Sequence, residues 1–346
     1  MKGKLDYRKT FLIGFGFLGT SIMWALYNTY VPIYLQAGSP AFDAKLAVQT
    51  FGFGLSATLT GFIMTLDNIA AFFIQPIMGA ISDRTYTRIG RRMPYILIFA
   101  PIAVLAFAVI PLVPQMIPEH LNGQLSQLRG PFALFVAALG VMLLAMSVFR
   151  TPVIALMPDL TPSPLRSKAN GVINLMGGLG GVLAFLGGGM LYKILRPLPF
   201  WVGGGLTLIA VAILYWKVKE PRKLVESAAN KEEGLGVFRG LRNIPQENKR
   251  SLVLLILAIF FWFVGYNAVE TFFSSYGVTT LGVSESTASM ILSAAYITFI
   301  LFAIPSGFIA TRFGRKRTII VGLAIFAVLL AIAFFTPVVP VIVALL

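Results

Sequence analysis

Long apolar runs alternate with short polar segments along this chain of 346 residues. A helix needs roughly 20 mostly apolar residues to cross a bilayer, and runs of that kind recur along the sequence. The predicted spans are residues 11–35, 56–81, 94–113, 131–157, 170–192, 198–216, 251–276, 286–310 and 318–336. A tenth run begins after Pro337 and Pro340, and the sequence stops inside it. The pattern predicts an all-α protein embedded in a membrane.

Composition excludes a soluble enzyme. Hydrophobic residues make up 57% of the chain, charged residues only 12%, and the mean hydropathy is +0.84. Soluble domains have about 45–50% apolar and about 25% charged residues. Because the chain contains no cysteine, it cannot form a disulfide, a zinc–thiolate site or a thiol catalyst. We therefore predict that the protein is not an enzyme, with no catalytic residue and no metal site.

What the net charge of +15 implies depends on where the basic residues lie. If the N-terminus is cytoplasmic, nearly all lysines and arginines fall in cytoplasmic segments. Those on the opposite side are Lys45, Arg129, Lys193 and Arg196, out of 28 in the chain. This asymmetry fits the positive-inside rule. The basic charge therefore orients a multi-pass protein with a cytoplasmic N-terminus, and it leaves no patch for nucleic acid.

Internal repetition divides the sequence into two halves. The first span carries Trp24, Tyr27 and Asn28, and the seventh carries Trp262, Tyr266 and Asn267 in a similar order. The loop after the second span, residues 79–92, has a counterpart in residues 307–317. Parallel six-span repeats form one transporter architecture, whose site lies between the halves near the bilayer midplane. We predict an N-terminal bundle over residues 1–216, a cytoplasmic linker over 217–250 and an incomplete C-terminal bundle over 251–346.

The loop of residues 79–92 resembles the signature of the major facilitator superfamily: a glycine, Asp-Arg four residues on, then Gly-Arg-Arg. The residues that carry it are Gly79, Asp83, Arg84, Gly90, Arg91 and Arg92, with Arg88 in an insertion. This longer form, with ALMPDL at residues 155–160, resembles the sucrose-type proton symporters. Residues 66–69 (LDNI) and 76–79 (PIMG) resemble the glycoside–pentoside–hexuronide cation symporters.

This resemblance implies the major facilitator fold of two six-helix bundles, here with nine to ten spans present. It implies secondary active transport of a sugar or glycoside-like solute, coupled to a proton or sodium, with no other cofactor. We expect a monomer in the bilayer of the plasma membrane. Two positions depart from the patterns: Thr311 stands for aspartate in the second loop, and Ile154 stands where the sucrose group has arginine, with Arg150 one turn earlier.

The resemblance also implies that the loop of residues 79–92 latches the cytoplasmic side. Gly79 and Gly90 permit close packing and tight turning, and Asp83 can pair with neighbouring arginines or with a helix N-terminus. The predicted latch consists of Gly79, Asp83, Arg84, Arg88, Gly90, Arg91 and Arg92. The alternative is that these arginines only set the topology.

Asp67 lies near the middle of the second span, where an ionisable side chain is costly unless it is paired or hydrated. We predict that it couples transport to the cation, and no lysine or arginine is expected at comparable depth. Asn68 and Thr60, one heptad earlier, would add oxygen ligands if the ion is sodium. The alternative is a structural carboxyl group that is protonated or bonds a neighbouring helix.

Sugars pack their C–H faces on aromatic rings and pair their hydroxyls with amides. The predicted substrate contacts are Trp24, Tyr27, Asn28, Arg150, Asn174, Trp262, Tyr266, Asn267 and Glu270. The aromatic residues fit interface anchoring or core packing equally well. Arg150, near the inner end of its span, also fits an anchor, and Glu270 also fits a solvated vestibule.

Three functions remain open from the sequence. A sugar–cation symporter is preferred. A proton-coupled exporter of amphipathic compounds would share the loop but would favour a more apolar cavity. A non-transporting scaffold or sensor is disfavoured, because acidic residues at membrane depth cost stability without a role.

Overall fold

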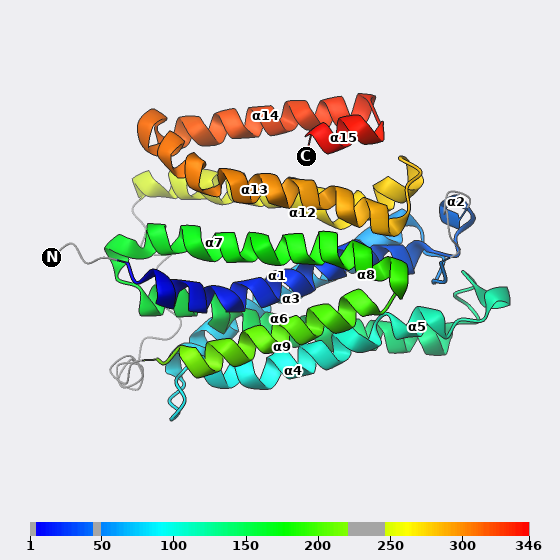
Figure 1. Ribbon diagram of the computed structural model, residues 1–346, viewed down its shortest axis with the longest axis horizontal. Helices are drawn as coiled ribbons and strands as arrows, with labels where there is room; N and C mark the ends of the chain where they lie inside the picture. Colours follow the sequence, from blue (N-terminus) through cyan, green and yellow to red (C-terminus); the bar gives the residue numbers. More distant parts are fainter. Residues whose placement is uncertain (1–4, 44–49, 221–245, 346) are drawn as a thin grey trace.

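The computed structural model describes residues 5–43, 50–220 and 246–345, and these residues form helices and connecting turns without a β-strand. Nine helices in this part of the chain are long and apolar enough to cross a membrane. They run side by side along the long axis of the molecule (Figure 1). The all-α fold and the predicted spans are therefore confirmed.

The first half of the chain contains most of the helices. They are α1 (Tyr7–Gln36), α2 (Pro40–Asp43), α3 (Ala57–Arg84), α4 (Met93–Val109), α5 (Leu112–Gln115), α6 (Arg129–Leu160), α7 (Arg166–Val182), α8 (Gly188–Ile194) and α9 (Leu198–Lys217). A π-helical turn, Leu183–Gly187, joins α7 to α8. The two segments therefore form one continuous rod that crosses the whole bundle.

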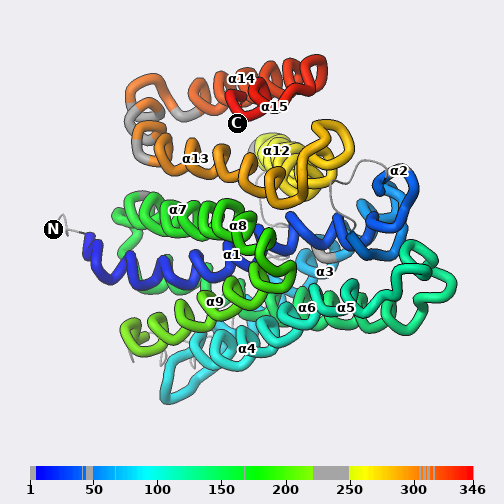
Figure 2. The backbone as a smooth tube through the Cα atoms, turned by 45° about the vertical axis from the view of Figure 1, so that its right-hand side comes forward, coloured from blue at the N-terminus to red at the C-terminus, as the bar shows by residue number. Residues whose placement is uncertain are grey.

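The second half contains α12 (Gln246–Thr279), α13 (Glu285–Phe313), α14 (Arg315–Phe335) and α15 (Val339–Leu345). α13 packs against α7 and α8, and α12 packs against α1, so the halves meet along these helices. Figure 2 shows α14 on the far side of α13 from the first half. The predicted boundaries at residues 216 and 250 stay predictions, since most of the linker lies outside the described residues.

α1 forms the centre of the first half. Every residue from Ala25 to Gln36 is buried, and the helix contacts α6, α7, α9 and α12. A helix that is buried on all sides needs apolar or small residues around its whole circumference. Its C-terminal end carries stacked rings, with Tyr30 and Tyr192 at 4.4 Å between ring centres.

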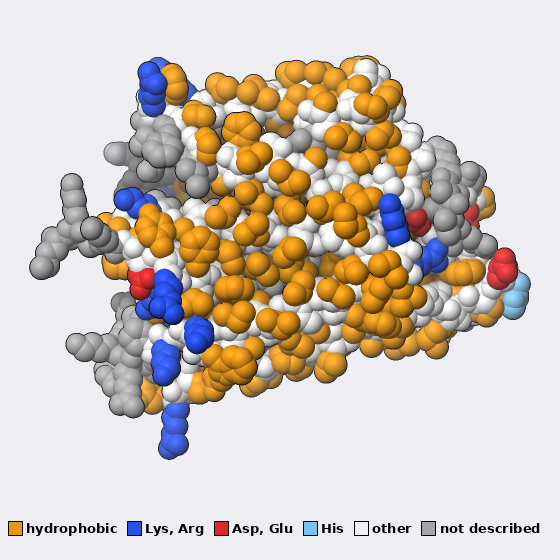
Figure 3. Space-filling model, viewed as in Figure 1, with side chains coloured by type: hydrophobic (Ala, Val, Ile, Leu, Met, Phe, Trp, Pro, Cys, Tyr) orange, Lys and Arg blue, Asp and Glu red, His pale blue; other side chains and the backbone are white. Residues whose placement is uncertain are grey.

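The surface around this core carries a broad hydrophobic belt, with lysines and arginines gathered mainly at one end (Figure 3).

Glycines set the distance between α1 and α7. A Cβ atom on Gly180 would lie 2.5 Å from the carbonyl oxygen of Leu18, and one on Gly177 would lie 3.2 Å from Ser21 Oγ. Small residues spaced along one helix face allow backbones in a membrane to approach closely. Because α7 has no side chains at these positions, α1 packs directly against its backbone.

Gly180→Ala should destabilise the first half, because the new methyl group meets backbone that cannot rotate away. Overpacking of this kind costs about 1–3 kcal/mol. Gly171→Ala on the same helix is the control, since its Cβ would meet nothing within 4 Å. Thermal unfolding in detergent should show a lower melting temperature for Gly180→Ala alone. Equal melting temperatures would contradict this account of the packing.

Candidate functional site

A cavity of about 230 Å³ lies between the two halves. Its lining comes from α1, α3 and α6 on one side and from α12 and α13 on the other. The lining residues are Thr20, Ser21, Trp24, Asn68, Arg150, Phe263, Tyr266, Asn267, Glu270 and Tyr296. Most of them carry a hydrogen-bonding group. The cavity can therefore offer donors and acceptors to a solute at membrane depth.

Glu270 is the buried carboxyl group of this cavity, with a relative exposure of 4%. Its Oε1 accepts a hydrogen bond of 2.9 Å from the Tyr296 hydroxyl, and the Tyr266 and Tyr296 hydroxyls lie 2.9 Å apart. Asn28 and Arg150 also lie close enough to interact with Glu270, although Asn28 Nδ2 has no hydrogen-bond partner of normal geometry among the described residues. A buried carboxyl group needs such partners, because an isolated charge in a dry interior is very costly.

Arg150 faces Glu270's side of the cavity from the other half. Its guanidinium carbon lies 5.3 Å from the ring centre of Trp24, within the range of a cation–π contact. Arg150 is ten residues from the end of α6 at Leu160, or about 15 Å along the axis. The predicted substrate contact by Arg150 thus has a place in the cavity lining. The expectation that no basic residue lies at the depth of Asp67 stays a prediction.

Five of the nine predicted substrate contacts line the cavity together: Trp24, Arg150, Tyr266, Asn267 and Glu270. Asn28 lies beside Glu270 without lining the cavity itself. Asn68, predicted as a coupling residue, also lines it. Tyr27 is buried against Trp24, with ring centres 5.6 Å apart. Trp262 stacks on Tyr266 and lies tilted against Phe326 outside the cavity, and Asn174 is exposed on α7. These last three do not line the cavity.

Sequence reasoning missed the lining residues Thr20, Ser21, Phe263 and Tyr296. The first three had a signal. Thr20 and Ser21 lie three or four positions before Trp24, and Phe263 lies three before Tyr266, so each shares a helix face with a predicted contact. Tyr296 had none, because its place depends on how α13 packs against α7.

The predicted coupling residues lie on α3. The side chain of Asp67 is outside the described part of the structure, so its role stays a prediction. Thr60 is buried, and its hydroxyl has no hydrogen-bond partner among the described residues. Seven residues of continuous helix separate Thr60 from Asp67 by about 10 Å along the axis. The predicted contribution of Thr60 to an ion site therefore stays a prediction.

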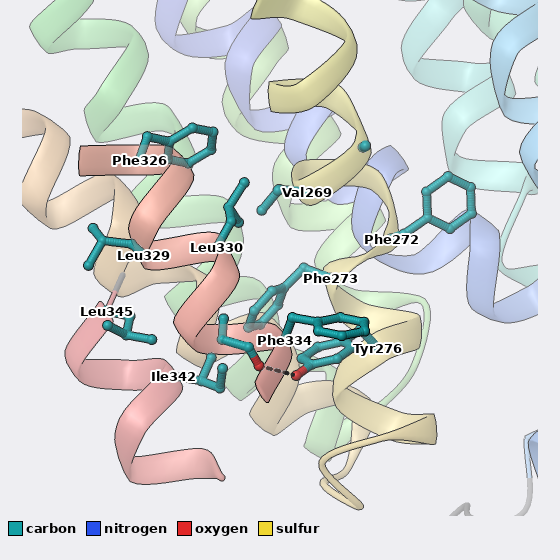
Figure 4. Close-up of a pocket in the computed structure, with 12 residues that line it drawn as sticks. Val269, Phe272, Phe273, Tyr276, Phe326, Leu329, Leu330, Phe334, Ile342 and Leu345 are labelled. Carbon is teal, nitrogen blue, oxygen red and sulfur yellow. Dashed lines mark hydrogen bonds between the residues drawn. The ribbon is translucent and has the colours of Figure 1, made fainter. Parts of the chain in front are cut away.

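A second hollow, of about 360 Å³, lies between α12, α14 and α15. Figure 4 shows that apolar side chains such as Leu329, Leu330 and Phe273 line it. The Tyr276 hydroxyl is already 3.4 Å from the Ala333 carbonyl oxygen and donates to it. With no charged or amide side chain in its lining, this hollow does not suit a polyhydroxylated solute.

The arginine loop is held by ion pairs at the end of the first half. Arg91 Nη2 lies 2.6 Å from Asp159, and Arg92 Nε lies 3.0 Å from the same carboxylate. Arg92 also pairs with Asp83 and donates to Ser82 and, at 3.4 Å, to the Gly79 carbonyl. Asp159 therefore ties the loop to the end of α6.

Glu220, just after α9, binds the other side of the loop. It accepts hydrogen bonds from the backbone N–H groups of Arg91, Arg92 and Met93, at 3.1, 3.0 and 3.2 Å. A carboxylate is favourable at the N-terminus of a helix such as α4. Gly90 makes this possible, because it has a φ of +121° and its missing Cβ would lie 2.5 Å from Glu220.

These partners correct the picture of the latch. Arg84 and Arg88 are exposed and form no ion pair with a described residue. The bonded members are Asp83, Arg91 and Arg92; of their partners, Asp159 lies on α6 of the first half and Glu220 follows α9 at the start of the predicted linker. Sequence reasoning named neither partner for the loop, because both lie far away along the chain. The loop fastens helices of one half together in this structure.

Comparison with known proteins decides the family. The sequence matches the Major Facilitator Superfamily over residues 13–346. The chain belongs to this superfamily. It is 25% identical to the isoprimeverose transporter of Lactiplantibacillus pentosus, over 78% of this chain and 55% of that protein. It is 27% identical to the human proton-associated sugar transporter A, over 54% of this chain and 23% of that protein. The chain thus spans about half or less of the length of these curated relatives.

Solved structures of the superfamily share the fold. A D-xylose-proton symporter aligns with a TM-score of 0.65 and 19% identity, over 98% of this chain and 76% of that one. A peptide transporter aligns with a TM-score of 0.57 and 14% identity, over 89% and 69%. Proteins named for different solutes thus share this architecture, so the solute must be argued from the cavity.

Asp159→Asn should destabilise this superfamily member more than Asp83→Asn. Asp159 pairs with two arginines and is 17% exposed, whereas Asp83 is 54% exposed. Losing a hydrogen-bonded charge here should cost about 1.5–3 kcal/mol. Chemical unfolding in detergent measures the difference, with Arg88→Gln as an exposed control. A larger loss for Asp83→Asn would contradict the assignment of Asp159 as the main anchor of the loop.

Proposed function

We propose that this protein is a secondary active transporter that carries a sugar or glycoside-like solute and couples its movement to a proton or sodium. The observation that carries the proposal is the cavity between the halves. Trp24 offers a flat ring, and Asn68 and Asn267 offer amide groups beside it. Sugar recognition uses this combination. Relatives named as sugar transporters support the same class of solute.

The lining also distinguishes this proposal from export of amphipathic compounds. Such a solute would favour an apolar cavity, whereas here Trp24 and Phe263 are accompanied by polar side chains from five helices. A scaffold is disfavoured for a different reason. Arg150 and Glu270 lie in the membrane interior, where ionisable residues are expensive and typically functional.

Alternating access is part of the proposal, and contacts between the halves support it. Gln36 Nε2 donates to Ser275 Oγ at 2.9 Å, and Ser289 Oγ donates to the Phe185 carbonyl at 2.8 Å. The Thr50 hydroxyl donates to Glu285. These bonds lie at the end opposite the arginine loop. With a cytoplasmic N-terminus in the plasma membrane, they close the outer side of the cavity.

Uptake into proteoliposomes tests the proposal. The purified protein is given radiolabelled glycosides, with and without a proton or sodium gradient. Accumulation above equilibrium that needs one of the gradients is the expected result and identifies the coupling ion. Absence of uptake and of exchange for every sugar, under all gradients, would overturn sugar transport.

Trp24→Ala should weaken sugar binding by roughly tenfold or more, because an aromatic ring that lines a binding pocket contributes a large share of binding. It also removes the ring beneath Arg150. Trp216→Ala is the matched control, since Trp216 is 69% exposed at the end of α9. Counterflow exchange measures the apparent affinity. Equal losses in both variants would remove Trp24 from the substrate site.

Asp67→Asn tests the predicted coupling residue. It keeps the size of the side chain but removes its titration. We expect gradient-driven accumulation to be lost while counterflow exchange continues, because exchange does not need net movement of the ion. Asn68→Ala serves as the neighbouring control and should act mainly on affinity, since Asn68 lines the cavity. Full accumulation by Asp67→Asn would show that another residue couples the ion.

A further inference from the structure

The cavity brings together one basic and one acidic side chain from opposite halves. Among the lining residues that the structure describes, Arg150 on α6 and Glu270 on α12 are the charged pair, and the others are neutral. Each of the two side chains contacts an aromatic residue. Arg150 lies over Trp24, and Glu270 accepts the Tyr296 hydroxyl. The two charged groups therefore line the same cavity from opposite halves and lie close enough to interact with each other.

The presence of one basic and one acidic side chain makes the cavity sensitive to the charge of a solute. The hydroxyls of a neutral sugar can donate to Glu270 and accept from Arg150, so both groups stay paired. A uronic acid brings a second carboxylate beside Glu270 and competes for the single guanidinium. One of the two carboxylates is then left without a counter-charge in a buried site, and juxtaposed like charges suppress binding of the wrong partner.

We propose that Glu270 is a specificity-determining residue that makes this cavity accept neutral sugars and reject their uronic acids. The inference rests on the proposed function and adds the charge class of the substrate. Tyr296 is a positioning residue in this account, because its hydroxyl holds Oε1 of Glu270 and is itself bonded to Tyr266. Removing the carboxylate takes away the group that competes with an acidic sugar for Arg150.

The experiment compares neutral and acidic forms of the same ring. Binding of D-glucose against D-glucuronate, and of D-galactose against D-galacturonate, is followed by tryptophan fluorescence of the purified protein, and uptake is followed in proteoliposomes. In Glu270→Gln the preference for the neutral form over the acid should fall by roughly tenfold or more. Glu119→Gln is the control, because Glu119 is exposed and lies outside this cavity.

Arg150→Gln provides the opposite change and an independent measurement. It should increase rejection of the uronic acids, and the double variant of Arg150→Gln with Glu270→Gln should return towards the wild-type preference. Melting temperatures establish that each variant is folded, and Arg150→Gln carries the test if Glu270→Gln does not fold.

The outcomes separate the two proposals. If the wild type prefers the neutral sugars but Glu270→Gln and Arg150→Gln keep the same preference, the charge filter is overturned and sugar transport stands. The charge filter is also overturned if Glu119→Gln shifts the preference as much as Glu270→Gln. If the wild type neither binds nor transports any sugar of either class, the proposed function itself fails.

Discussion

A charged side chain in the bilayer interior must find a partner, because lipid supplies neither water nor counter-charge. The rest of this structure depends on how that constraint is met. Arg150 and Glu270 sit in different halves, and each contacts an aromatic side chain of its own half, Trp24 and Tyr296 respectively. Both also line a polar cavity between the halves, where they lie close enough to interact with each other. The charged pair of this site thus follows from where the two residues lie on their helices.

Much of the fold follows from the sequence because hydrophobic length and loop charge are local properties. Residues 318–336 are apolar whatever surrounds them, and α14 covers nearly the same residues. Which face of a helix lines a cavity depends on how the helices pack against one another. Arg150 shows the difference: its place near the end of a span was read from α6 alone, whereas its contact with Trp24 on α1 and its place in the cavity depend on how the helices pack.

Long-range partners account for what the sequence could not show at the site. Asp159 and Glu220 bind the arginine loop from positions 67 and 128 residues away from Arg92. No local pattern marks such a pairing. The repeated motif was only a partial guide, because one copy of each aromatic pair lines the cavity: Trp24 but not Trp262, and Tyr266 but not Tyr27. Trp262 packs towards Phe326 on α14 instead.

The bare backbone of α7 has a consequence for the chemistry of the cavity. A Cβ atom on Gly181 would lie 2.1 Å from the ring of Tyr296, so this ring rests directly on the peptide chain of the opposite half. The same tyrosine holds Glu270. If the two halves move along α7, the Tyr296 ring would lose its contact with this glycine backbone, and Glu270 would lose its hydrogen-bond donor. Movement between the halves would therefore change the hydrogen bonding of Glu270.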